Sequence, residues 1–323
     1  MDNLPTSQLA DYSMSDLAII GAGICGLRCA EVLQPAGITV ELFDKGRGVG
    51  GRLATRRHEQ WRFDHGAPSL HGETAQWCER FHHYPAWDCD NNARHYLPEL
   101  GVNQLAKELA EPLNIQRGCQ IQSIERRATG WALVDQHGSE HGPYANLVIT
   151  APCPQTQALI KTLDTPIIKT LADVHMTPAW VMMLVTALPI ITTQELRPTH
   201  DVIRRISAEH SKPERALGPA DYHYVVEAAV AWSQKHEEDN PTDVQATLIA
   251  SLQDITTDMG QLLHCAVHRW RYAHTGRALG RPYLFDSDLG LAVAGDWCLG
   301  IGAEGAYLSG EALAKMLLES SHH

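Results

Sequence analysis

Residues 17–55 read LAIIGAGICGLRCAEVLQPAGITVELFDKGRGVGGRLAT, and the prediction of the fold depends on this stretch. Its first four residues are too few and too apolar for an exposed helix and run straight into glycine, which indicates a buried parallel strand. Gly21, Gly23 and Gly26 then form GxGxxG, a pattern that combines a tight turn, close approach of backbone amides to a pyrophosphate, and close helix–strand packing. The helix predicted over residues 24–33 would turn its positive N-terminal end toward that phosphate.

The GxGxxG pattern alone occurs in many unrelated loops, so its surroundings decide how it is interpreted. Residues 35–37 (Pro-Ala-Gly) end the predicted helix, and residues 38–43 are apolar and β-branched, which indicates a second strand. Asp44 closes that strand roughly 20 residues after the glycines, where an acid accepts hydrogen bonds from an adenosine ribose. A solvated turn acid is the alternative. The predicted dinucleotide site comprises Gly21, Ala22, Gly23, Cys25, Gly26, Asp44 and Lys45.

A second glycine motif follows, RxxGGRxxT over residues 47–55, and then FDHGA over residues 63–67. The glycine pair allows close backbone approach, and Arg52 offers a planar fork of donors to a phosphate or flavin oxygen. These motifs resemble the second glycine motif and the following acid–glycine motif of the FAD-dependent amine-oxidase superfamily, in particular its renalase-like branch. The resemblance implies cofactor contacts from Gly50, Gly51, Arg52, Gly66 and Ala67.

Length and charge limit the classes of protein to consider. A chain of 323 residues can bury one large core or two modest ones, and we expect two connected domains. The net charge of −12 argues against nucleic acid or an anionic membrane as partner, since both require a basic face. No apolar run approaches the roughly 20 residues of a membrane span. Residues 1–14 lack the pattern of a signal peptide and read as a flexible extension, so we expect a cytoplasmic protein.

Cysteine and histidine usage indicates no metal site. The eight cysteines are scattered without a C-x-x-C pair, which favours reduced thiols over disulfides. The adjacent pairs His82-His83 and His322-His323 lack ligand-like partners.

The chain after the flavin motifs alternates between regular and irregular segments. Residues 70–96 carry five aromatic side chains without clear periodicity, and they either line a cleft or pack under a loop. A helix is predicted within residues 97–109, from Val102 onward, and a strand over 115–124. The superfamily resemblance implies that Ile121 offers its backbone to the adenine ring. A meander over 131–134 with a turn at His137-Gly138, and a buried strand over 146–152, complete this block.

The middle of the chain is expected to form the substrate domain. Residues 178–188 and 222–232 read as strands, and residues 241–255 as a helix with Asn240 or Thr242 as its cap. Blocks starting at Pro178, Ala231 and His268 resemble, in order, the substrate domain of renalase-like proteins. Their aromatic residues are either core or a substrate platform, and Trp270 and Tyr272 are the preferred platform candidates over Trp180 and Trp232.

The end of the chain returns to the first domain. Residues 289–296 read as a buried strand that ends in Gly-Asp, and residues 303–318 as an apolar helix. This arrangement resembles the C-terminal flavin motif of the superfamily, in which a helix N-terminus stabilises negative charge on the reduced flavin. The resemblance implies cofactor contacts from Asp296, Glu304, Gly305 and Ala306.

The predicted fold is α/β. A Rossmann-like FAD-binding domain with a parallel sheet and an antiparallel meander takes residues 15–70, 97–155 and 285–319, and an α+β substrate domain on a mixed or antiparallel sheet takes 71–96 and 156–284.

The resemblance implies an oxidoreductase with non-covalent FAD. It would take hydride from a small reduced nitrogen compound, either a dihydronicotinamide dinucleotide isomer, with NAD(P)H as a related candidate, or an amine, and dioxygen would give hydrogen peroxide. The chain departs from the renalase-like branch at residues 68–70 (Pro-Ser-Leu), where that branch has an aromatic residue or glutamine. The alternative is therefore a flavin-binding module with a degenerate cleft. A nicotinamide dehydrogenase without flavin would leave Gly50 and Asp296 unexplained.

Overall fold

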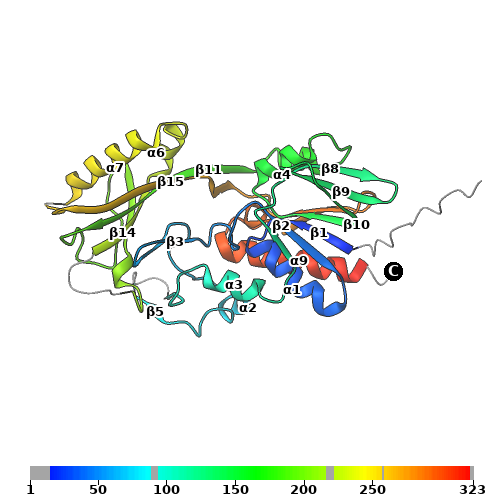
Figure 1. Cartoon of the computed structure of the whole chain (residues 1–323), viewed down its shortest axis with the longest axis horizontal. Coiled ribbons are helices and arrows are strands. Elements are labelled where there is room, and N and C mark those ends of the chain that lie inside the picture. Colours follow the sequence, from blue (N-terminus) through cyan, green and yellow to red (C-terminus); the bar gives the residue numbers. More distant parts are fainter. Residues whose placement is uncertain (1–14, 89–93, 216–221, 257, 321–323) are drawn as a thin grey trace, which may run out of the picture.

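The structure, a computed structural model, describes residues 15–88, 94–215, 222–256 and 258–320. They form two sheets with helices packed against them, which is the predicted α/β fold (Figure 1). The predicted extension over residues 1–14, Cys89 and the C-terminal histidine pair lie outside the described residues.

The first sheet has eight strands in the order β16-β17-β10-β1-β2-β7, and β8 and β9 extend it from β10. β1 runs parallel to β2 and β10, as the alternation of strands and helices predicts. β10 pairs in two ways along its length: its first half is antiparallel to β9, and its second half is parallel to β1 and β17. The strands are β1 Ser15–Ile20, β2 Val40–Asp44, β7 Ile115–Arg117, β8 Ile121–Arg127, β9 Gly130–Asp135, β10 Glu140–Ile149, β16 Tyr283–Asp286 and β17 Leu291–Ala294.

Helices cover both faces of this sheet. α1, α3 and α9 share one apolar core, and α4 and α5 share another. α1 and α9 cross closely because a Cβ at Gly310 would lie only 2.2 Å from the Cys25 carbonyl oxygen. This crossing packs a helix near the start of the described chain against the last helix. The helical segments around this sheet are α1 Ile24–Leu33, η1 Gln34–Ala36, α2 Ala75–Cys78, α3 Gln104–Ala110, α4 Cys153–Ile160, α5 Ile167–Leu171, α8 Asp296–Leu299 and α9 Gly302–Ser320.

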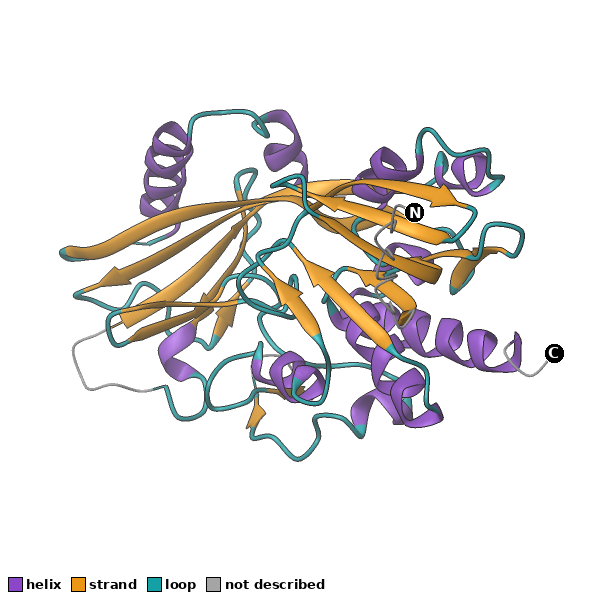
Figure 2. Ribbon diagram, turned by 45° about the vertical axis from the view of Figure 1, so that its right-hand side comes forward, coloured by secondary structure: helices purple, strands orange, loops and turns teal. Residues whose placement is uncertain are grey.

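The second sheet has five strands in the order β12-β13-β14-β11-β15 and is antiparallel throughout. Figure 2 shows its long strands reaching toward the first sheet. α7 packs against one face, and Asn240 caps this helix by accepting a hydrogen bond from the Thr242 amide at 2.8 Å. The elements are β11 His175–Thr186, β12 Glu195–Leu196, β13 Ile203–Ala208, η2 Glu209–Ser211, β14 Tyr222–Ala228, α6 Val230–Lys235, α7 Pro241–Ile255 and β15 Leu262–Arg277.

Two small hairpins complete the fold. The first packs Trp61 and Phe63 on the face of the second sheet opposite α7, against Val181 and Met183. The hairpins are β3 Thr55–His58 with β4 Trp61–Asp64, and β5 Ala86–Trp87 with β6 His95–Tyr96.

Two expected strands are wrong in part. The strand predicted over residues 115–124 is broken at Gly118, whose φ of +68° turns the chain out of the parallel sheet before β8 joins β9. The strand predicted over residues 222–232 ends at Ala228, and α6 follows, so Trp232 lies on a helix. The aromatic residues between 70 and 96 prove to be core, since Trp77, Phe81, Tyr84 and Trp87 are all buried.

No helix among the described residues is both long and apolar enough to cross a membrane.

Candidate flavin site and the junction of the two sheets

The first glycine loop has the geometry of a nucleotide-binding turn. A Cβ at Gly26 would lie 2.0 Å from the Gly21 carbonyl oxygen. Only a glycine at this position therefore allows the helix to pack so closely on the end of the strand. At Gly23, by contrast, a Cβ would meet no other heavy atom within 4 Å. The loop is therefore tight on its inner side and open where a phosphate would approach the start of α1.

Asp44 lies across from this loop, at the end of β2. Its carboxylate accepts hydrogen bonds from the Ala22 amide at 2.7 Å and the Gly46 amide at 2.6 Å. Burial raises the pKa of Asp44, although these two donors oppose the shift. Asp44 thus fixes the loop, and its contact with a ribose stays a prediction. Two other predicted contacts differ in exposure, since Lys45 is exposed and Ile121 is buried.

The second glycine motif lies directly beside the first. Gly50 donates its amide to the Ala22 carbonyl at 2.8 Å, and Gly23 and Gly50 form an isolated parallel bridge. A Cβ at Gly51 would lie 3.7 Å from the Gly23 Cα. Two loops more than twenty residues apart in the sequence therefore lie backbone against backbone, with open space beside Gly23. The residues present fit an extended dinucleotide.

Arg52 and Asp296 connect the second motif to the last one. Both terminal nitrogens of Arg52 donate to the Asp296 carboxylate, at 2.5 and 2.9 Å, and one also donates to the Ala273 carbonyl at 3.0 Å. Thr275 adds a third hydrogen bond to Asp296 at 3.1 Å. The fork of Arg52, expected to face a phosphate or flavin oxygen, is thus engaged by a carboxylate and by β15. Its contribution to cofactor binding stays a prediction.

The remaining predicted contacts surround this pair. Ala67 donates its amide to the Arg52 carbonyl at 2.9 Å, and a Cβ at Gly66 would lie 1.9 Å from that same oxygen. Glu304, in the first turn of α9, accepts from the Thr74 amide at 2.7 Å and from its hydroxyl at 2.6 Å. Glu304 therefore holds the segment before α2. Three other predicted contacts, Cys25, Gly305 and Ala306, lie in the first turns of α1 and α9.

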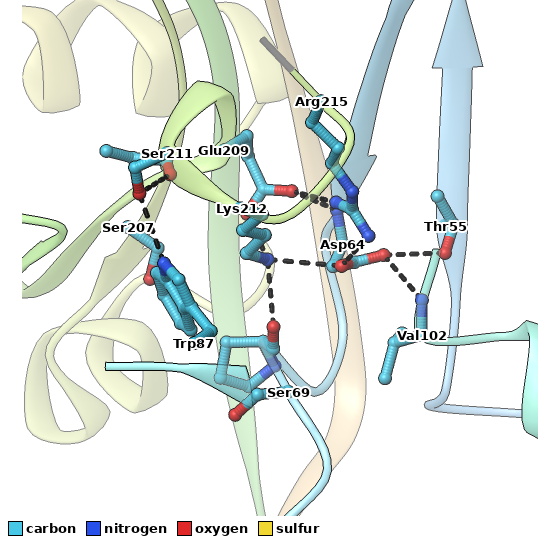
Figure 3. Close-up of polar contacts among 12 residues, drawn as sticks. Thr55, Asp64, Ser69, Trp87, Val102, Ser207, Glu209, Ser211, Lys212 and Arg215 are labelled. Atoms are coloured by element: carbon cyan, nitrogen blue, oxygen red, sulfur yellow. Dashed lines mark hydrogen bonds and ion pairs between the residues drawn. The ribbon is translucent and has the colours of Figure 1, made fainter. Parts of the chain in front are cut away.

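A buried group of four charges lies behind the FDHGA motif, and Figure 3 shows it. Asp64 binds Lys212 at 3.1 Å and Arg215 at 2.6 Å, and Glu209 binds the same two cations at 2.5 and 2.7 Å. We call Asp64, Glu209, Lys212 and Arg215 the ion quartet. All four side chains are at most 1% exposed, and their formal charges cancel.

Further hydrogen bonds anchor the ion quartet to its surroundings. Asp64 accepts from the Thr55 hydroxyl at 2.6 Å and the Val102 amide at 3.0 Å, and Lys212 donates to the Pro68 carbonyl at 2.8 Å. Burial by itself opposes ionisation of Asp64, but Arg215 and Lys212 outweigh it and hold the pKa of Asp64 well below its usual range. The ion quartet ties β4 and the segment after it to η2 of the second sheet.

His65, the next residue, enters a different environment. Its ring stacks on Trp270 with centroids 5.4 Å apart and meets His268 edge-on at 5.0 Å. The indole of Trp270 donates to the His65 carbonyl at 2.8 Å. We call His65, His268 and Trp270 the histidine–indole cluster. Burial, His268 and Arg56 lower the pKa of His65 to about 4, and burial and Arg56 lower that of His268 to about 4.

Of the four candidate platform residues, only Trp270 belongs to the histidine–indole cluster. Trp270 faces the β3–β4 hairpin, whereas Trp180, on the neighbouring strand, is buried on the opposite face of the sheet and donates to the His236 carbonyl at 2.9 Å. Tyr272 packs instead against a core of the first sheet. Of the aromatic candidates, Trp270 lies at the hairpin, three residues before the Ala273 carbonyl that Arg52 binds.

Sequence reasoning missed the ion quartet and both histidines of the cluster. Asp64 and Arg215 are 151 residues apart in the chain, and isolated charged residues ordinarily indicate solvated surface. The only available signal was the FDHGA motif, in which Asp64 precedes His65, because histidine is the side chain whose charge changes near neutral pH.

The fold and the paired glycine loops define a dinucleotide-binding architecture, and comparison with known proteins identifies the family. A family model described as flavin containing amine oxidoreductase matches residues 80–318, and one described as NAD(P)-binding Rossmann-like domain matches residues 19–84. The chain belongs to the flavin containing amine oxidoreductase family, and membership implies a flavin cofactor.

Solved structures share the fold at low sequence identity. A crystal structure assigned as a protoporphyrinogen oxidase of Exiguobacterium sp. 255-15 superposes with a TM-score of 0.70 at 13% identity, covering 94% of this chain and 99% of that one. An oxidoreductase from Methanosarcina mazei gives 0.68 at 13% identity, covering 93% and 100%. Putrescine oxidase bound to putrescine gives 0.68 at 11% identity, covering 94% and 99%. At these identities the similarity establishes the fold alone.

Proposed function

We propose that the protein is a renalase-like oxidase that binds FAD non-covalently. It takes hydride from a small reduced nitrogen compound, either a dihydronicotinamide dinucleotide isomer or an amine. Dioxygen accepts the electrons and becomes hydrogen peroxide. Family membership supports the flavin and the redox chemistry, and the resemblance of the FDHGA motif and of the three middle-chain blocks to renalase-like proteins supports the branch.

The chain's own groups would hold the cofactor by its two ends. The open side of the first glycine loop and the N-terminus of α1 would bind the pyrophosphate, and Asp44 would accept from the ribose. Arg52 and Asp296, held together, would position the second and last motifs at the other end. When bound, the flavin supplies a hydride acceptor at N5 and passes two electrons to dioxygen, which takes up two protons.

The observation that carries the substrate class is the histidine–indole cluster. With pKa values of about 4, both imidazoles are neutral at pH 7 and do not repel the positive charge that develops as hydride leaves a nitrogen compound. The face of Trp270 attracts such a charge. The Nδ1 atom of His65 is buried and lacks a hydrogen-bond partner, so it could serve a bound substrate.

The same cluster favours a dihydropyridine ring over a polyamine. Its groups are two imidazoles and an indole, none of which carries a negative charge. A dication such as putrescine would need carboxylates in that position, whereas a neutral, electron-rich ring stacks on an aromatic surface.

Anaerobic titration of the purified protein tests the proposal. We expect a yellow protein whose flavin is released by acid denaturation, is bleached within seconds by a dihydronicotinamide dinucleotide isomer and more slowly by amines, and is reoxidised by air with one peroxide per turnover. Flavin that precipitates with the protein would contradict non-covalent binding. Bleaching by amines alone would contradict the preferred substrate.

One observation favours a second candidate, a flavin-binding module without turnover. Trp61 and Phe63 pack directly on Val181 and Met183, so the hairpin covers part of the sheet face on which substrate would bind. Residues 68–70, the departure from the renalase-like branch, are fixed here by the contact of Pro68 with Lys212. A stable flavin spectrum that no amine or reduced dinucleotide bleaches would support this candidate.

A further inference from the structure

Three side chains of metal-ligating types meet at the meander, apart from the glycine loops. Cys119 precedes β8, Asp135 ends β9, and His141 lies near the start of β10. The Cys119 Sγ lies 3.8 Å from the His141 Nε2 and 3.9 Å from the Asp135 Oδ2, and the last two atoms are 3.1 Å apart. We call these residues the meander triad.

The geometry is that of converging ligands, not of a nucleophile with its relay. In a catalytic triad the nucleophile and the acid bind opposite nitrogens of the imidazole, so that one orients the ring while the other loses a proton. Here the thiol and the carboxylate both face Nε2. One sulfur, one nitrogen and one oxygen therefore point toward a common centre.

We propose that the meander triad binds a single divalent transition-metal ion of the zinc class. Zinc bonds of about 2.3 Å to sulfur and about 2.0–2.2 Å to nitrogen and oxygen, at tetrahedral angles, separate the ligand atoms by about 3.4–3.6 Å. All three distances of the meander triad fall within about 0.3 Å of that range, so only small side-chain movements are needed.

Surrounding contacts already orient the ligands. The second oxygen of Asp135 accepts from the amides of His137 at 2.8 Å and Ser139 at 3.0 Å, which leaves Oδ2 directed at the centre. The amide of Cys119 donates to the Asp44 carbonyl at 2.9 Å, and the edge-to-face contact of Phe43 holds the ring of His141. Such support of the ligands is typical of metal sites.

The ligand chemistry selects the ion. A thiolate and an imidazole suit zinc and related transition metals, whereas magnesium and calcium require oxygen ligands. Cys119 and His141 are both partly exposed, which leaves the fourth position to water. Three protein ligands and a water form the usual open zinc site.

The test uses the full-length protein, stripped with chelator and titrated with Zn²⁺ or Co²⁺ alone. Isothermal titration should show a Zn²⁺ site in the wild type whose affinity falls at least about tenfold in Cys119→Ser and in His141→Gln. Co²⁺ should give a sulfur-to-cobalt charge-transfer absorption that Cys119→Ser abolishes. His137→Gln, an exposed histidine of the same meander, and Cys265→Ser, on β15, are the matched controls and should keep both signals.

All variants retain the terminal histidine pair, so metal bound there cancels from the comparison. Circular dichroism identifies a variant that does not fold. If one of the two ligand variants fails to fold, the Zn²⁺ affinity of the other tests the proposal. Equal Zn²⁺ affinity in the wild type and the folded ligand variants would overturn the proposal. Loss of the cobalt absorption in Cys265→Ser but not in Cys119→Ser would also overturn it.

Discussion

Asp64 and His65 are neighbours in the chain, yet the fold places them in opposite electrostatic surroundings. Asp64 is fully buried, ionised and bound to two cations of the ion quartet. His65 is also buried, but it lies against an imidazole and an indole, and its pKa of about 4 keeps it neutral. One residue faces η2 and the other faces β15.

The difference shows how two adjacent residues at the end of β4 can be buried in opposite charge states. Buried charge is tolerated in the ion quartet because each carboxylate meets both cations, and Asp64 accepts further hydrogen bonds from the Thr55 hydroxyl and the Val102 amide. The Nε atom of Arg215 is buried without a hydrogen-bond partner among the described residues. In the histidine–indole cluster, burial instead lowers the pKa values of both imidazoles to about 4 and so removes their charge at neutral pH. Four predictions test this contrast.

The largest effect is expected from Asp64→Asn, because the amide leaves two buried cations with only one carboxylate. Breaking a buried ion group in this way costs about 3–5 kcal/mol of unfolding free energy. Urea denaturation of the flavin-saturated protein measures it. Glu140→Gln, which breaks an exposed ion pair with Arg127, is the control and should leave the midpoint near that of the wild type. Equal midpoints for the two variants would show that the ion quartet does not hold the hairpin to the second sheet.

The second prediction separates the two regions by pH. His65 and His268 stay neutral in the folded protein down to about pH 4, whereas in the unfolded chain they take up protons below about pH 6.5. The free energy of unfolding therefore falls as the pH drops from about 6.5 toward about 4. The pKa of Asp64 is depressed, so its contribution is present above its ordinary value of 3.8 and is lost only below that pH. His268→Asn should flatten the loss between pH 6.5 and 4 and spare the loss below it, as melting curves across pH would show. An unchanged slope would contradict the neutral state of the cluster.

The third prediction concerns the cofactor side of the junction. Arg52→Lys keeps the charge but loses the paired donors to Asp296, and the loss of one charge-assisted hydrogen bond, about 1.5–3 kcal/mol, should weaken FAD binding by one to two decades. The flavin midpoint potential should shift as well, while the melting temperature with saturating FAD stays close to that of the wild type. Arg57→Lys, exposed on β3, is the control. Wild-type affinity and potential in Arg52→Lys would show that this pair does not position the cofactor.

The smallest effect is expected from Trp270→Phe, which removes the indole donor to the His65 carbonyl. The lost hydrogen bond should cost about 0.5–1.5 kcal/mol of stability, and the rate of anaerobic flavin reduction by substrate should fall. Trp232→Phe, on α6, makes the same exchange where the indole stacks on His236, and it should not change that rate. A rate that drops equally in both variants would remove Trp270 from the substrate platform.

The sequence predicted the elements whose residues interact locally. α1 spans residues 24–33 as expected, and α7 follows the Asn240 cap, because glycine, proline and capping residues act on their immediate neighbours. The expected strand over residues 115–124 was wrong in part because local pattern does not reveal that Gly118 sends its two halves to different partners. The residue limits of the two domains remain a prediction.

By itself the sequence determined the dinucleotide fold and the membership in a flavin family, since glycine spacing and strand pattern are local properties that require no partner. Only the tertiary structure decided what the charged and aromatic side chains do. It paired Arg52 with Asp296 across 244 residues, closed the ion quartet around Asp64, and turned Trp270 toward His65 while burying Trp180 on the opposite face. The physical reason is that ionisation and hydrogen bonding depend on burial and on partners far apart in the chain, and only folding brings these together.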